Sequence, residues 1–130
     1  MVTTGAAAAL TLAAAAAIAR WDVAKMAALP HADAFPHDIL VPRTQRTGYA
    51  HALAASGARL VDIGHNDRGT GAGVRGLEAW EIETALSPSV VAVFFSANAA
   101  SLADFPTAAS VCKAQGIPLI VDAAAQFGEF

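Results

Sequence analysis

One carboxylate in the sequence stands where open α/β sheets bind their ligands. Asp122 directly follows the apolar run 119–121, which predicts a short strand with Asp122 at its carboxyl end. Ligands of open α/β sheets bind outside these strand ends, and an unpaired aspartate is rarely buried. We therefore predict that Asp122 contacts a ligand, with a role as a helix N-cap as the alternative.

A turn of small residues precedes the alanine-rich stretch near the start of the chain. Residues 4–7 read Thr-Gly-Ala-Ala and lead into a predicted helix. The first N–H groups of a helix have no partner inside it, and the helix dipole favours negative charge there. On the residues alone a tight turn into a buried helix is the favoured interpretation, and a phosphate-binding turn is the alternative.

Other candidate motifs are weaker. Gly71, Gly73 and Gly76 fit the pattern G-x-G-x-x-G, but the preceding strand is predicted to end near Ile63, well before the first glycine. A dinucleotide-binding turn follows its strand almost at once, so a flexible loop is the favoured interpretation and an NAD-type site the rival. The four histidines lack metal-ligand spacing, and no nucleophile elbow or P-loop is present.

Helical and strand-like patterns alternate between these segments. Such alternation predicts an α/β fold, in which helices cover both faces of a mostly parallel sheet in a three-layer αβα arrangement. We expect an irregular segment over 21–38, a cap from Thr3 or Thr4 on the first helix, a left-handed glycine at 57 and a helix that ends at Gly116. The predicted helices span 5–20, 47–55, 77–86 and 105–115, and the predicted strands span 39–41, 59–63, 90–95 and 119–121.

Composition limits the class of protein. The 130 residues are 55% apolar and 15% charged, with a net charge of −3, which is typical of one folded domain. Eight scattered basic residues give no support to a nucleic-acid surface. The single cysteine, Cys112, excludes an intrachain disulfide and fits a reducing cytoplasm.

The alanine-rich start could also be a signal peptide or a membrane span. No basic residue precedes Arg20, and alanine is a good helix former but only weakly hydrophobic. A buried helix is therefore the favoured interpretation, with a signal peptide as the alternative and no membrane partner expected. Both ends of the chain look abrupt, so we expect residues 1–130 to be an incomplete domain, truncated at both ends.

Three segments together resemble pyridoxal-phosphate (PLP) enzymes of the aspartate-aminotransferase fold, fold type I. They are residues 4–9, residues 46–64 and residues 118–126, which ends in the run Asp-Ala-Ala-Ala-Gln. Within that fold the chain looks most similar to the group of selenocysteine synthase (L-seryl-tRNA selenium transferase), which includes D-glucosaminate-6-phosphate ammonia-lyase. The resemblance covers almost the whole chain but only the middle of the family's large domain.

The resemblance implies roles for the residues singled out above. The N–H groups of Gly5, Ala6 and Ala7 would hold the phosphate of PLP. Asp122 would pair with the pyridinium nitrogen and keep it protonated. Ala124, two residues further on, would pack on one face of the ring if the strand continued that far.

Two further positions take roles from the resemblance. Gln45 stands where the family usually has a histidine that stacks on the ring, and glutamine stacks less well. Arg68 would meet an anionic group of the substrate. The lysine that forms the Schiff base in this fold comes well after the aspartate, and neither Lys25 nor Lys113 occupies that position.

The implied parent is a cytoplasmic lyase or transferase that acts on a small amino acid or amino-sugar acid. Its reaction would be α-proton abstraction followed by β-elimination, and its site would lie at a homo-oligomer interface. The lack of a basic RNA-binding surface favours the lyase branch. Without the lysine, this chain is expected to be inactive alone, and a non-catalytic α/β binding or structural fragment is the alternative.

Overall fold

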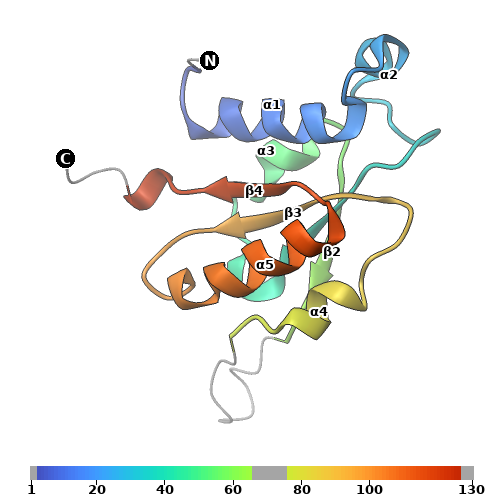
Figure 1. Ribbon diagram of the computed structural model, residues 1–130. Helices are drawn as coiled ribbons and strands as arrows, with labels where there is room; N and C mark the ends of the chain where they lie inside the picture. The colour runs from blue at the N-terminus through green and yellow to red at the C-terminus, as the bar shows by residue number, and fades with distance from the viewer. Residues whose placement is uncertain (1–2, 66–75, 127–130) are drawn as a thin grey trace.

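The computed structural model of the chain, shown in Figure 1, describes residues 3–65 and 76–126. Its centre is a sheet of four parallel strands in the order β2-β1-β3-β4. Because all four strands run the same way, their carboxyl ends lie at one edge of the sheet. The strands are β1 (Asp38–Pro42), β2 (Arg59–Ile63), β3 (Val90–Ser96) and β4 (Leu119–Asp122).

Helices cover both faces of this sheet. In Figure 1, α1 (Ala6–Ala19) and α3 (Ala50–Ala54) lie on one side, and α4 (Ala79–Glu83) and α5 (Phe105–Gln115) lie on the other. This arrangement confirms the predicted three-layer αβα fold. None of the described helices is long and apolar enough to cross a membrane. The remaining helices are α2 (Val23–Ala28) and the 3-10 helices η1 (Arg43–Gln45), η2 (Leu102–Asp104) and η3 (Ala124–Gln126).

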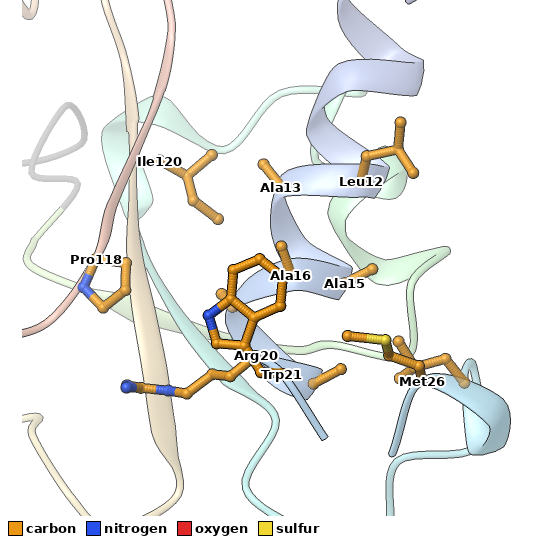
Figure 2. Close-up of a pocket in the computed structure, with 12 residues that line it drawn as sticks. Leu12, Ala13, Ala15, Ala16, Arg20, Trp21, Met26, Pro118 and Ile120 are labelled. Carbon is orange, nitrogen blue, oxygen red and sulfur yellow. The ribbon is translucent and has the colours of Figure 1, made fainter. Parts of the chain in front are cut away.

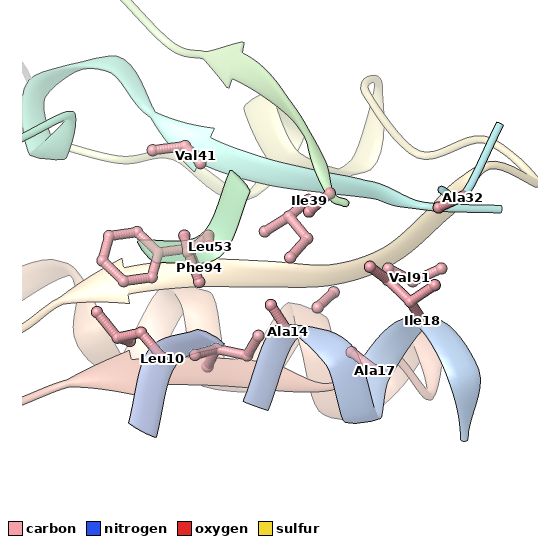
Figure 3. Packing of buried hydrophobic residues seen from close by; sticks show 13 residues of the cluster. Leu10, Ala14, Ala17, Ile18, Ala32, Ile39, Val41, Leu53, Val91 and Phe94 are labelled. Atoms are coloured by element: carbon pink, nitrogen blue, oxygen red, sulfur yellow. The ribbon is translucent and has the colours of Figure 1, made fainter. Parts of the chain in front are cut away.

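The face under α1 is packed through small and branched side chains. Leu10, Ala14 and Ile18 recur every fourth residue along α1 and are buried against the sheet, where Ile39 and Phe94 meet them (Figure 3). Alanine at the centre of this stripe lets the helix approach the strands closely. The buried helix predicted from the alanine-rich segment is therefore present.

A polar contact joins the two helices on this face. The hydroxyl of Thr11 lies 2.8 Å from the carbonyl oxygen of Ala52 in α3 and 3.1 Å from that of Ala7 in its own helix. The hydroxyl can donate to either carbonyl oxygen, or share its hydrogen between them, while Thr11 stays helical. Thr11 thus fixes the placement of α1 relative to α3.

The start of the chain differs from the prediction in two places. Gly5, not Thr3 or Thr4, is the N-cap of α1, and the Thr3 hydroxyl donates to the Gly5 carbonyl at 3.0 Å. The segment expected to be irregular contains α2, because the Asp22 carboxylate accepts from the N–H of Ala24 at 2.9 Å and caps a six-residue helix.

Two predicted helices are shorter than expected. The segment predicted over 47–55 is helical only in α3, because residues 47–49 form turns in which Thr47 accepts from Ala50 N–H. The segment predicted over 77–86 is helical only in α4, which Glu78 caps. The boundaries of α5 agree with the prediction, and Gly57 has the predicted positive φ, 98°. Gly116, which ends α5, also has a positive φ, 65°.

One ion pair joins the first residues of β1 and β2. Asp38 is buried, with 3% of its surface exposed, and accepts from Arg59 Nε at 2.7 Å and Nη2 at 2.6 Å. Removing the guanidinium leaves a buried carboxylate without its cation. We expect Arg59→Ala to lower the urea midpoint measured by circular dichroism, whereas Arg43→Ala, at an exposed position, should not. Equal midpoints for the two variants would contradict this role.

A close backbone approach depends on Gly57. A Cβ built there would lie 2.1 Å from the Pro30 carbonyl oxygen, and the positive φ disfavours other residues. We expect Gly57→Ala to reduce the free energy of unfolding by more than about 1 kcal/mol. Gly48→Ala is the matched control, because nothing lies within 4 Å of its added methyl group. A smaller loss at Gly57 than at Gly48 would refute this account.

Candidate cofactor site

The carboxyl ends of β1, β3 and β4 are joined by hydrogen bonds. Gln45, in η1 just after β1, is buried, and its Oε1 accepts from Ser96 N–H at the end of β3 at 2.8 Å. Ser96 pairs in register with Asp122 at the end of β4. The N–H of Ala97 then donates to the Asp122 carbonyl at 2.8 Å. Gln45, Ser96 and Asp122 therefore follow one another across the edge of the sheet.

Asp122 is partly exposed at this edge. Its Oδ1 accepts from the N–H of Ala124 at 3.1 Å, which is the capping contact expected of the alternative role. A carboxylate has two oxygens and about four acceptor positions, so this single bond leaves capacity for a cationic or N–H-bearing ligand. Capping and ligand binding are thus compatible at Asp122.

The first turn of α1 supplies N–H donors. Gly5 is the N-cap without any side-chain cap, and the first intrahelical bond runs from Ala9 N–H to Gly5 oxygen at 3.1 Å. The N–H groups of Ala6, Ala7 and Ala8 precede this bond and so have no partner within the helix. A Cβ at Gly5 would meet no atom within 4 Å, so the space beside the turn is open.

The first turn of α1 and the end of β4 lie at the same end of the molecule. Figure 1 shows both at the left, because α1 runs antiparallel to β4 across the sheet. The positive end of the helix dipole and Asp122, the last residue of β4, therefore lie at the same end of the molecule. A ligand with an anionic group at one end and a cationic ring at the other matches this polarity.

The position of Ala124 differs from the expectation. Strand β4 ends at Asp122, and Ala124 opens η3 with an exposed side chain. The strand does not continue to Ala124, so the condition under which strand alternation would place Ala124 on the side of Asp122 is not met. A contact between Ala124 and a bound ring remains a proposal.

Gln45 is held by the protein itself. Its carboxamide oxygen is committed to Ser96 N–H, and its side chain is only 3% exposed. Gln45 is therefore part of the floor of the candidate site. The residue after it, Arg46, contacts Asp62 at the end of β2 through Nη1, which joins the fourth strand end to the same edge.

Three predicted positions lie outside the described residues. They are Arg68, the expected substrate contact, and Gly71 and Gly73 of the glycine motif. Gly76 is described and lies beside Asp104, two residues before the Glu78 cap of α4. Among residues 3–65 and 76–126, no group of three or more His, Cys, Asp or Glu could hold a metal ion.

Polar residues after β3 form a part of this edge that the sequence interpretation missed. The Asn98 Oδ1 accepts from Ala100 N–H at 2.9 Å, and Ser101 Oγ accepts from Asn98 N–H at 3.0 Å. Ser101 is buried and also donates to the Ser96 carbonyl. The signal was available, because Ser96 and Asn98 follow a buried strand just as Asp122 does.

Both lysines lie away from this edge. Lys25 belongs to α2, beyond the far end of α1, and its Nζ lies 5.6 Å from the centre of the Phe35 ring. Lys113 is exposed near the end of α5, at the opposite end of that helix from the strand ends. Neither is placed to reach a ligand held between α1 and Asp122.

Comparisons with known proteins identify relatives of this chain. No protein-family model matches it. It is 27% identical over 136 aligned residues to D-glucosaminate-6-phosphate ammonia lyase of Salmonella typhimurium (strain 14028s / SGSC 2262), covering 96% of this chain and 34% of that protein. A solved D-glucosaminate-6-phosphate ammonia-lyase matches 92% of the chain with a TM-score of 0.78 and 25% identity, over 32% of its own length.

A second solved structure, the aminotransferase TlmJ from Streptoalloteichus hindustanus, matches 68% of the chain with a TM-score of 0.53 and 25% identity, over 23% of its own length. The chain thus spans about a third of the length of the ammonia-lyases that it matches. The chain is therefore similar over almost its whole length to D-glucosaminate-6-phosphate ammonia-lyase, and its α/β fold matches that of this lyase and of an aminotransferase.

Proposed function

We propose that this chain forms the cofactor-binding part of a PLP-dependent lyase or transferase. The observation that carries the proposal is the placement of the α1 first turn and Asp122 at one end of the fold. PLP carries a phosphate and a protonated ring nitrogen, which match N–H donors and a carboxylate. The open space beside Gly5 and the available oxygen of Asp122 fit such a molecule.

Each residue has a distinct proposed role. The N–H groups of Gly5, Ala6 and Ala7 bind the phosphate, and Asp122 holds a proton at the ring nitrogen. When bound, the protonated ring withdraws electrons from the substrate carbon that loses its proton. Gln45 supports the floor through Ser96, and Ala124 borders one face of the ring. Arg68 is proposed to meet an anionic group of the substrate.

The reaction proposed for the whole protein is α-proton abstraction and β-elimination on an amino acid or amino-sugar acid. It rests on the relationship to an ammonia-lyase, and we propose a cytoplasmic homo-oligomer of the selenocysteine synthase-like group. The described chain contributes no lysine at the strand ends, so we propose that it binds the cofactor but is inactive alone. Residues 1–130 would then be an incomplete large domain.

The specific alternative is a non-catalytic α/β binding or structural fragment. The observation that favours it is the position of Lys25 and Lys113, both remote from the candidate site. The two functions differ in whether the chain binds the cofactor. Pyridoxamine 5′-phosphate is a suitable probe, because it keeps the phosphate and the ring nitrogen but has no aldehyde to react with these lysines.

The contribution of Asp122 is tested by Asp122→Asn, titrated with pyridoxamine 5′-phosphate and followed by its fluorescence. We expect the affinity to fall about tenfold or more, because a hydrogen bond to a charged group is worth about 1.5–3 kcal/mol. Asp33→Asn, at an exposed position, serves as the control. Unchanged affinity in Asp122→Asn would refute the role of Asp122, and no binding by the wild type would support the alternative fragment.

The contribution of the α1 turn is tested by Ala7→Glu, which places a negative charge beside the proposed phosphate. Ala7 is exposed, so the longer side chain can be accommodated. We expect weaker binding of pyridoxamine 5′-phosphate but little change for pyridoxamine, which lacks the phosphate. Ala114→Glu, exposed on α5, is the matched control. Equal losses for both ligands would show that the phosphate lies elsewhere.

A further inference from the structure

The largest hollow among the described residues offers few contacts to a polar ligand. It is a groove of about 750 Å³ between α1, α2 and the start of β4. Apart from Arg20 and Trp21, which Figure 2 shows at the end of α1, the side chains that line it are apolar. A polar ligand is oriented by a few well-placed polar groups, and the described chain gathers such groups at the carboxyl ends of β1, β3 and β4.

One peptide group at these strand ends is bound through both of its polar atoms. It joins Ser96, the last residue of β3, to Ala97. Its N–H donates to the Asp122 carbonyl at 2.8 Å, and its carbonyl oxygen, which belongs to Ser96, accepts from the Ser101 hydroxyl. Register pairing of β3 with β1 ends three residues earlier, at Val93. The carbonyl therefore lies beyond that pairing, and the Ser101 hydroxyl supplies the donor in place of a strand.

Ser101 is itself fixed by a tight turn. It is 6% exposed, and its Oγ accepts from Asn98 N–H at 3.0 Å. Asn98 Oδ1 accepts in return from the N–H of Ser101 at 3.2 Å and from that of Ala100 at 2.9 Å. Ser101 Oγ also lies 3.3 Å from the Asn98 carbonyl oxygen, a longer contact than the one to Ser96. These bonds hold the hydroxyl at the Ser96 carbonyl.

The position of this peptide group affects Asp122 because the two are bonded and lie on the same strand pair. Phe94 and Ile120 pack in the cluster under α1, and Ser96 and Asp122 follow them two residues later in the same strands. Side chains alternate between the faces of a sheet, so Asp122 is on the α1 face. A shift of the Ser96–Ala97 peptide moves the Asp122 backbone, and the carboxylate moves with it.

We propose that Ser101 positions Asp122 for its ligand, by holding the Ser96–Ala97 peptide through its hydroxyl. Ser101 is a positioning residue, since it acts on the ligand only through the backbones of β3 and β4. The effect on ligand affinity rests on the proposed function, because it requires that Asp122 bind the ring nitrogen. The effect on the strand ends does not require a ligand, so the two effects are measured separately.

Hydrogen exchange of the 130-residue chain, followed by NMR, tests the strand ends without any ligand. We expect Ser101→Ala to speed the exchange of Ala97 N–H about tenfold or more relative to Val93 N–H, which donates to the Pro118 carbonyl in the middle of β3. Ser56→Ala is the matched control, because Ser56 is also buried and its hydroxyl donates to a backbone carbonyl at 2.7 Å. An unchanged exchange ratio in Ser101→Ala, or an equal change in Ser56→Ala, overturns the positioning role.

Asn98→Ala is the second variant, and it is less disruptive because Asn98 is only half-buried. It removes the side-chain acceptor of Ser101 N–H but keeps the hydroxyl, so the exchange ratio should rise by a smaller factor. If Ser101→Ala does not fold, as judged by circular dichroism, an unchanged ratio in Asn98→Ala overturns the proposal.

Titration with pyridoxamine 5′-phosphate tests the effect on ligand binding. We expect Ser101→Ala to weaken binding about fivefold, and Ser56→Ala to leave it unchanged. In a chain that already carries Asp122→Asn, Ser101→Ala should cause no further loss, because Ser101 acts through Asp122.

The outcomes separate this proposal from the proposed function. Wild-type affinity in Ser101→Ala, or a full additional loss in the double variant, refutes the action of Ser101 through Asp122 while the proposed function stands. A wild-type chain that does not bind pyridoxamine 5′-phosphate refutes the proposed function, and the exchange ratio of Ala97 to Val93 then decides whether Ser101 holds the strand ends.

Discussion

The hydrogen bond from Ser96 N–H to Gln45 Oε1 is the contact on which the candidate site depends. It is made by a buried side chain and joins two strand ends that are 51 residues apart in the sequence. Ser96 is in turn the register partner of Asp122, so its position in β3 sets how far β4 extends before Asp122 reaches the edge of the sheet. A buried amide oxygen left without this donor would cost free energy, so the arrangement has one favoured geometry.

Much of the fold could be predicted because its strands can be recognised from the apolar residues in the sequence. The run 90–95 is apolar throughout, which is typical of a strand covered on both faces, and five consecutive residues of β3 are indeed buried. Helix α5 was predicted at its boundaries, since Pro106 lies in its first turn and Gly116 adopts the left-handed conformation that ends it. Alternation of such elements then determines the three layers.

The features that the sequence did not predict each have a physical explanation in particular residues. Helix α2 has six residues, too few to show a helical period, and depends on the Asp22 cap. The Thr3 hydroxyl donates to a carbonyl instead of accepting from the helix, which no local pattern reveals. The Gln45–Ser96 contact exists only after β1 and β3 pair. The candidate position of Asp122 was accessible from sequence because it depends only on the end of one strand.

The hydroxyl of Thr11 has a consequence for ligand length. The hydroxyl donates to the Ala52 carbonyl and so joins α1 to α3, which begins a few residues after Gln45. The amides of the α1 turn are therefore held at a fixed position relative to Gln45. The distance between an anion bound at the α1 turn and a ring bound above Gln45 is thereby fixed by the protein. A site of this kind discriminates among ligands by the separation of their two ends as well as by their charges.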